Sequence, residues 1–377
     1  MNTRRLLAVS RKEVLHLRRD PRSLALGFAI PVLLLLLFGY VLTLDVDRVP
    51  LAVWDRSRTP ESRELVSRFE GSRYFQVVLR AEGYPGMEAA IDEGWVLAAL
   101  VIPEDFAGRV GSDRSSPVQL LLDGSEANTA TIALGYAESV VSGYSADLEV
   151  RWARAKGLQG IRPPLDVRSR VWFNTGLESR NFIVPGLISV IMMIISALLT
   201  SLTVAREWEQ GTMEQLLATP VTGPELILGK LVPYFLIGMA DVVVAVTMGT
   251  LLFQVPFRGS MPLLFGIAAV FLAGALSLGM LFSVAARSQL PASQMAMAFT
   301  FLPSYLLSGF VFSIDSMPPL ARAITYLVPS RYFVKAIKGV WLKGVGLRTL
   351  AAEGALLLAF AGMTILAATR LFHKKLR

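Results

Sequence analysis

The sequence predicts an α-helical membrane protein with six transmembrane helices, one followed by five, and an α/β domain inserted after the first. Of its 377 residues, 53% are hydrophobic and only 18% are charged. The mean hydropathy of +0.53 is typical of integral membrane proteins. Six apolar runs are long enough to cross a bilayer. Residues 45–181, which separate the first run from the second, have a different character and alternate between strand-like and helical patterns.

Residues 1–23 are predicted to form a cytoplasmic amphipathic helix on the inner membrane surface. Leu7, Val14 and Leu17 fall along one helical side, and basic residues occupy much of the remainder: Arg4, Arg5, Arg11, Lys12, Arg18 and Arg19. Asp20-Pro21 ends this helix, and residues 24–44 follow without a charge as the first transmembrane helix. About 21 residues at about 1.5 Å each reach about 31 Å, enough for a hydrocarbon core of about 30 Å. A cleaved signal peptide is the alternative, but the run is too long for one.

Residues 45–181 are predicted to be an extracytoplasmic α/β domain. Strand-like runs at 51–54, 75–79, 98–102 and 118–122 alternate with helical stretches at 61–70 and 87–93. A helical run at roughly 127–156 leads back toward the membrane, and 167–173 is expected to be a last strand. The acidic residues are scattered, so we interpret them as solvated surface charge rather than catalytic pairs.

No catalytic, metal or cofactor site is predicted in this chain. It has no cysteine, and its two histidines, His16 and His373, lie near the termini. The net charge of +8 lies mainly beside apolar runs, where basic residues set orientation and contact lipid headgroups rather than nucleic acid. Residues 223–231 superficially resemble a P-loop. However, Pro224 replaces its first glycine and Leu231 replaces its Mg²⁺-binding Ser or Thr.

Residues 182–377 are predicted to form a five-helix transmembrane domain. The apolar runs lie at roughly 182–205, 231–253, 261–286, 292–312 and 350–372. Thr222 and Glu225 form a capping-box pattern, so the second of these helices begins before the membrane. Six spans put both termini on one side, and the basic residues near both ends put that side in the cytoplasm. The basic outer segment 313–349 argues against this orientation, which we keep because the two termini agree.

The loop at 206–219 is predicted to be a short acidic amphipathic helix. Met213, Leu216 and Leu217 stand at i, i+3 and i+4 and share one side. The acidic residues lie elsewhere: Glu207, Glu209 and Glu214. An acidic helix is poorly suited to anionic lipid. A groove on a partner protein suits it better, with an ordinary solvated loop as the alternative.

Two further features concern a transport path. Asp241 lies near the middle of the third span, where a carboxylate costs about 2.5–3.5 kcal/mol on insertion scales, so it should face the bundle or water. It would contact a cationic substrate or link helices. Four methionines in the spans could form an adaptable apolar lining, although ordinary helix packing is the stronger alternative: Met192, Met193, Met295 and Met297. In segment 313–349, residues that share one helical side form either an interface anchor or an outer gate: Phe333, Ile337, Val340 and Trp341.

With this layout, the sequence resembles the ABC-2 type permeases, in particular the bacterial drug-efflux branch with a large extracytoplasmic domain. The resemblance covers essentially the whole chain and depends on ordered blocks: VWFN at 171–174, SRNFIVPG at 179–186, REWEQGTMEQLLATP at 206–220, LGKLVPY at 228–234, PSYLLSGF at 303–310, SMPP at 316–319 and VPSRYF at 328–333. Thr175 is a departure, since the family usually has proline there.

The resemblance implies a half-transporter that dimerises with a second copy or a paralogue and recruits a cytoplasmic ABC ATPase. ATP and Mg²⁺ would be held by that ATPase, and this chain would not be an enzyme. The residues implied to contact the ATPase are those of the coupling helix 206–219: Arg206, Glu207, Trp208, Glu209, Gly211, Thr212, Met213, Glu214, Leu216 and Leu217.

We expect export of amphiphilic drugs or lipid-like molecules across the inner membrane. Domain 45–181 would lie in the periplasm and could dock a periplasmic adaptor protein. Export of a polysaccharide or lipid-linked glycan is an alternative within the same class. A membrane receptor or assembly scaffold without transport is the alternative from another class.

Overall fold

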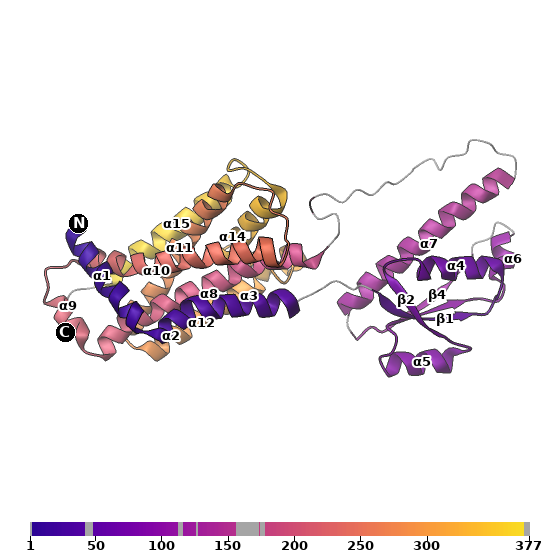
Figure 1. The fold of residues 1–377 in the computed structure, drawn as a ribbon, viewed down its shortest axis with the longest axis horizontal. Helices are drawn as coiled ribbons and strands as arrows, with labels where there is room; N and C mark the ends of the chain where they lie inside the picture. Colours follow the sequence, from indigo (N-terminus) through magenta and orange to yellow (C-terminus); the bar gives the residue numbers. More distant parts are fainter. Residues whose placement is uncertain are drawn as a thin grey trace. The chain divides into compact units, whose positions relative to one another are not determined.

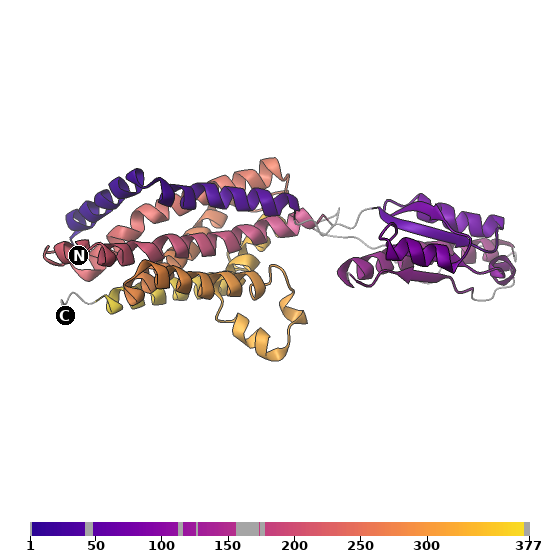
Figure 2. The ribbon, with the colours of Figure 1, turned by 90° about the horizontal axis from the view of Figure 1, so that it is seen from below.

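A computed structural model of the chain describes residues 2–41, 48–111, 116–125, 127–155, 173 and 178–372. The chain forms two compact units, shown in Figures 1 and 2. Residues 1–43 and 171–377 make the helical unit, and residues 44–170 make the α/β unit. Apart from Phe173, the strand predicted at 167–173 lies outside the described residues.

The α/β unit contains a four-stranded mixed sheet with the order β2-β1-β3-β4. Strand β1 pairs in parallel with β2 and β3, whereas β3 and β4 are antiparallel. Apart from α6, which was not predicted, the elements lie close to the predicted ones: β1 Val49–Asp55, α4 Pro60–Glu70, β2 Phe75–Arg80, α5 Tyr84–Asp92, β3 Ala98–Ile102, α6 Phe106–Gly111, β4 Gln119–Leu122 and α7 Ala127–Ala155. The predicted alternation of strands and helices is therefore confirmed.

Two hydrophobic cores hold this sheet, one on each face. Helices α4 and α7 cover one face, where Phe69 and Leu100 are buried with Tyr144 of α7. Helix α5 covers the other face, where Met87 packs against Ala99. All five residues of β3 are buried because both faces of this central strand are covered.

The helical unit begins with a bent N-terminal segment and continues after the α/β unit. Its elements are α1 Thr3–Arg19, α2 Pro21–Leu24, a π-helical turn Ala25–Ala29, α3 Ile30–Val41, α8 Ser179–Glu209, α9 Thr212–Leu217, α10 Gly223–Thr247 with a π-helical turn Met248–Leu252, α11 Met261–Ala286, α12 Gln289–Leu306, a 3₁₀ turn Ile314–Ser316, α13 Pro319–Thr325, α14 Pro329–Lys338 with a π-helical turn Gly339–Lys343, and α15 Ala351–Leu371. As predicted, α1 ends at Asp20-Pro21.

Within the described residues, four helices are long and apolar enough to cross a membrane. They are Ser179–Glu209, Gly223–Leu252, Met261–Ala286 and Ala351–Leu371. The predicted first span contains a shorter apolar helix, Gly27–Val41. Where a span was predicted at 292–312, α12 ends at Leu306, three residues after Pro303. The helical membrane class is thus supported, while the count of six spans is not confirmed.

Helices α8 and α11 form the centre of the helical unit. Most of the apolar window of each is buried, 83% in α8 and 61% in α11, against 28% in both α10 and α15. The two central helices approach closely because Gly279 has no side chain: a Cβ there would lie 2.1 Å from the carbonyl oxygen of Ala197. The start of α1 and the end of α15 lie at the end of the unit that carries α9 (Figure 1). There, Asn2 N donates to Glu225 Oε1 at 2.6 Å, and Phe372 lies against Gly223.

Candidate functional site

Helix α1 packs against the N-terminal half of α10. Ser10 Oγ donates a hydrogen bond to the carbonyl oxygen of Gly229 at 2.7 Å. A Cβ at Gly229 would lie 2.9 Å from Val9 Cβ, so this close approach requires glycine. The buried side of α1 differs from the predicted apolar stripe: Leu17 is buried, but Leu7 and Val14 are exposed. The side facing the protein instead includes two polar residues, Ser10 and Glu13.

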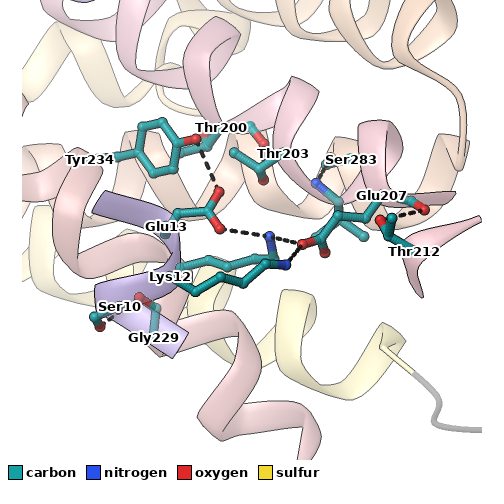
Figure 3. A network of polar contacts seen from close by, with 12 residues as sticks. Ser10, Lys12, Glu13, Thr200, Thr203, Glu207, Thr212, Gly229, Tyr234 and Ser283 are labelled. Carbon is teal, nitrogen blue, oxygen red and sulfur yellow. Dashed lines mark hydrogen bonds and ion pairs between the residues drawn. The ribbon is translucent and has the colours of Figure 1, made fainter. Parts of the chain in front are cut away.

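A buried network of charged side chains joins α1, α8 and α10 (Figure 3). Lys230 of α10 is 1% exposed, and its ammonium lies 3.1 Å from Glu13 Oε2 and 2.9 Å from Glu207 Oε1. Tyr234 OH donates to Glu13 Oε1 at 3.2 Å. Lys12 Nζ reaches the same Glu207 oxygen at 2.6 Å from the more exposed side. A buried charge is tolerated only when it is paired in this way, so the network fixes the three helices relative to one another.

The turn between α8 and α9 is held by a second set of polar contacts. Arg206 pairs with Asp20 at 2.6 Å, which connects it to the end of α1. Glu209 accepts hydrogen bonds from Ser288 Oγ at 2.6 Å and from Gln289, at the turn between α11 and α12. The guanidinium of Arg287 lies over the Trp208 ring at 5.1 Å.

The predicted coupling residues fall into buried and exposed groups. Glu207 and Met213 are buried in this chain, Met213 completely, so Met213 is not on the surface that was predicted to enter a partner's groove. Gly211 has a left-handed backbone with φ +68°, which turns the chain into α9. Glu214 is exposed and Leu216 is partly buried against the core. The side chain of Leu217 lies outside the described part of the structure.

A polar cavity of about 400 Å³ lies beside this network. Helix α1 contributes Lys12, Glu13 and His16 to its wall. The other lining residues come from α8, the α8–α9 turn, α9 and α10: Thr203, Arg206, Glu207, Gln210, Thr212, Gln215, Leu216, Thr219 and Tyr234. Because segments far apart in sequence meet here, a change in the position of α9 would alter the contacts of α1 and α10.

Asp241 lines a separate, mostly apolar cavity of about 30 Å³ between α3, α8, α10 and α11. Its Oδ1 is buried and has no hydrogen-bond partner among the described residues. A cavity of this size has room for a water molecule, which needs about 10–15 Å³, and the carboxylate of Asp241 is a polar group that could bind it. Of the four methionines, Met192 lines the cavity, Met193 is buried in the core, Met295 packs near Phe282 and Met297 is 53% exposed.

The three residues predicted as an outer gate are buried in the helical core. The rings of Phe333 and Phe271 stack with their centroids 4.2 Å apart. Trp341 packs against Gly249, where a Cβ would lie 2.6 Å from the indole, and Ile337 is 2% exposed. The shared helical side predicted from their spacing is therefore the packed side of α14 and its π-helical turn.

Sequence reasoning missed Glu13 and Lys230 as members of a site. Glu13 is an acidic residue in a strongly basic helix, and Lys230 is a cation inside an apolar helix. Each is anomalous by itself, but 217 positions separate them in sequence, so spacing could not pair them. Among the residues that the structure describes, no group of three or more metal-ligating side chains could hold an ion.

The long apolar helices define an integral membrane protein, and its buried polar network joins helices at the end that carries α9. The profile of the ABC-2 family transporter proteins matches residues 21–370. The probable multidrug ABC transporter permease YbhS of Escherichia coli is 39% identical over 345 residues, which cover 91% of this chain and 90% of that protein. The probable multidrug ABC transporter permease YbhR of the same bacterium is 32% identical and covers 91% of each chain. The inner membrane transport permease YhhJ is 26% identical over 88% of this chain and 86% of its own length.

This chain therefore belongs to the ABC-2 family of transporter proteins, as its sequence blocks predicted. It is the permease component of an ABC transporter.

Proposed function

We propose that this permease exports amphiphilic drugs or lipid-like molecules across the inner membrane, driven by a separate cytoplasmic ATPase. The observation that carries the proposal is the similarity over nine-tenths of the chain to YbhS, which is described as a probable multidrug permease. Because YbhR and YbhS are two similar proteins of one bacterium, the partner permease is either a second copy or a paralogue.

The segment 206–219 is proposed to be the face that contacts the ATPase. Within helix α9, Glu214 and Gln215 are exposed, and Leu216 adds a partly buried apolar edge. Glu207 and Glu209 would act from behind this face, because both are engaged within the chain. Movement of α9 would reach α1 through Arg206–Asp20 and α10 through Glu207–Lys230.

The proposed orientation puts α9 and both termini in the cytoplasm, with the α/β unit in the periplasm. Asn2 and Phe372 both contact the start of α10, which supports a common side for the two ends. The α/β unit would dock a periplasmic adaptor protein. Asp241 and Met192 would lie on the substrate path, and Phe333, Ile337 and Trp341 on its outer closure. Since the Asp241 cavity is only about 30 Å³, a drug-sized substrate would require it to widen.

A cross-linking experiment tests the coupling face. The chain has no cysteine, so Glu214→Cys provides a single reactive site in the full permease. A thiol-to-amine cross-linker applied to inner-membrane vesicles should join it to a nucleotide-binding protein. Ser313→Cys is the matched control, because Ser313 is also exposed but lies in the loop before α13, outside the segment 206–219. Equal cross-linking at both sites, or none at Glu214→Cys, would contradict the proposal.

A further inference from the structure

The two carboxylate oxygens of Glu207 differ in their hydrogen-bond partners. Its Oε1 accepts from two ammonium groups, Lys12 at 2.6 Å and Lys230 at 2.9 Å. Its Oε2 is buried and has no hydrogen-bond partner among the described residues, although the side chain is only 9% exposed. A buried charged oxygen without a donor is unfavourable, so this arrangement is incomplete.

Glu207 lines the 400 Å³ cavity between α1 and the α8–α9 turn. The charged or titratable side chains of its wall are Lys12, Glu13, His16, Arg206, Glu207 and Tyr234. Arg206 is already paired with Asp20, and Lys12 is 45% exposed, so its ammonium can move into solvent at little cost. The rest of the wall near Glu207 offers neutral acceptor oxygens: Gln210, Thr212, Gln215 and Thr219.

We propose that this cavity is a socket for one arginine side chain of the cytoplasmic ATPase. The proposal rests on the proposed function, because it names the group that the ATPase contributes to the coupling face. A guanidinium has five donors in a planar fork, so it can take the place of the Lys12 ammonium at the Glu207 carboxylate and still reach the amide and hydroxyl oxygens of the cavity wall. The cavity is continuous with the exposed positions of α9, since Gln215 belongs to both.

An arginine in this socket would act on more than one helix, because the socket is connected to α1 and α10. Lys230 joins Glu207 to Glu13, so a cation that binds Glu207 would act on α8, α10 and α1 together. Lys12 would give up its contact with Glu207 when the arginine enters, because both compete for one carboxylate. Binding of the ATPase would thus change the contacts of α1, the first helix of the permease.

The charge preference of the cavity can be measured without the ATPase. Thr212→Cys places one thiol in the wall of the otherwise cysteine-free, full-length permease. Methanethiosulfonate reagents with a trimethylammonium, a methyl or a sulfonate group then serve as probes. After each rate is divided by that of a free thiol in solution, the cationic reagent should react about tenfold faster than the anionic one, and Glu207→Gln should bring this normalised ratio near unity. Glu214→Gln is the matched control, because it removes a carboxylate from the same segment outside the cavity wall.

The second arm uses the ATPase that co-purifies with the permease. Its binding should slow modification of Thr212→Cys by about tenfold or more, and Glu207→Gln should weaken its retention by about tenfold. Glu207→Asp keeps the charge and should retain the ATPase better than Glu207→Gln, which separates the socket from a general loss of folding.

Three results would overturn the socket. Equal normalised rates for the three reagents would show a cavity that holds water only. Protection by the ATPase with no dependence on Glu207 would remove the socket but leave the coupling face. Absence of any ATPase from the wild-type permease would contradict the proposed function as well, whatever the reagents show.

Discussion

The two units of this protein use charged side chains in different ways. In the helical unit, Lys230 is 1% exposed and binds two carboxylates from helices far apart in sequence. In the α/β unit, Arg68 pairs with Asp147 at 2.7 Å and Arg151 with Glu64 at 2.8 Å, and all four side chains are 35–56% exposed. Buried pairs fix which helices move together, whereas exposed pairs are screened by water and contribute little. The comparison indicates that charged side chains link helices to one another in the helical unit, whereas in the α/β unit they mainly make the surface soluble.

The largest effect is expected from Lys230→Met, which leaves Glu13 and Glu207 without their shared ammonium. Removing one partner from a buried ion pair costs about 3–5 kcal/mol, so the helical unit should melt at a markedly lower temperature. Thermal unfolding of the purified permease in detergent measures this. Lys12→Met is the control, because Lys12 is 45% exposed and should cost about 1 kcal/mol or less. Similar losses in the two variants would remove the distinction between buried and exposed charges.

A smaller effect is expected from Gly229→Ala, which disturbs α1 without changing a charge. The added Cβ would lie 2.9 Å from Val9 Cβ, so α1 must shift at a cost of about 1–3 kcal/mol. Limited proteolysis should then cut α1 faster. Gly354→Ala is matched to it, since a Cβ at Gly354 meets no atom within 4 Å and alanine favours a helix. If α1 is cut equally in both variants, its packing on α10 is not what protects it.

Asp241→Asn neutralises a buried carboxylate whose Oδ1 has no described hydrogen-bond partner, in contrast to the paired carboxylates of Glu13 and Glu207. Asp241 Oδ1 has no described partner, so neutralising this carboxylate should leave stability within about 1 kcal/mol of wild type. Export of cationic dyes should fall about tenfold relative to neutral dyes if the carboxylate attracts the substrate. Efflux from intact cells measures the export of both dye classes. Equal loss for the two dye classes would identify Asp241 as a link between helices instead.

The smallest effect is expected from Glu64→Gln in the α/β unit. The hydrogen bond from Arg151 holds the pKa of Glu64 below its usual value. The stabilisation is therefore present above the unfolded-state pKa of about 4.3 and is lost as the pH falls through the lower folded-state pKa. Because the pair is exposed, the difference from wild type should be less than about 1 kcal/mol at pH 7, and it should shrink as the pH falls through the folded-state pKa of Glu64. Hydrogen exchange at α4 measures it, and a large difference at pH 7 would contradict the comparison.

Much of the fold could be predicted because its signals are local. Short apolar runs bounded by turns predicted the strands of the α/β unit, and Asp20-Pro21 predicted the end of α1. The capping box before α10 is formed, with Thr222 N donating to Glu225 Oε2 at 2.9 Å. Each of these features depends on residues within one or two helical turns of one another.

The site could be predicted only in part because its contacts are not local. The periodicity of Met213, Leu216 and Leu217 identified a helix and an apolar side, but it could not say whether that side faces this chain or a partner. Burial of Met213 gives the answer for one residue. The pairing of Glu13 with Lys230 depends on how α1 packs on α10, which no short sequence pattern encodes.

Transport by the reconstituted complex tests the central claim most directly, namely that an ATPase drives this permease through the α8–α9 segment. The permease and its co-purified ATPase are placed in inside-out vesicles with a fluorescent amphiphilic dye. Dye should accumulate only with hydrolysable ATP. Replacing the exposed pair by Glu214→Arg with Gln215→Arg should abolish accumulation while the permease remains folded, because these exposed residues are proposed to contact the ATPase. Full ATP-dependent accumulation by this variant would contradict the account.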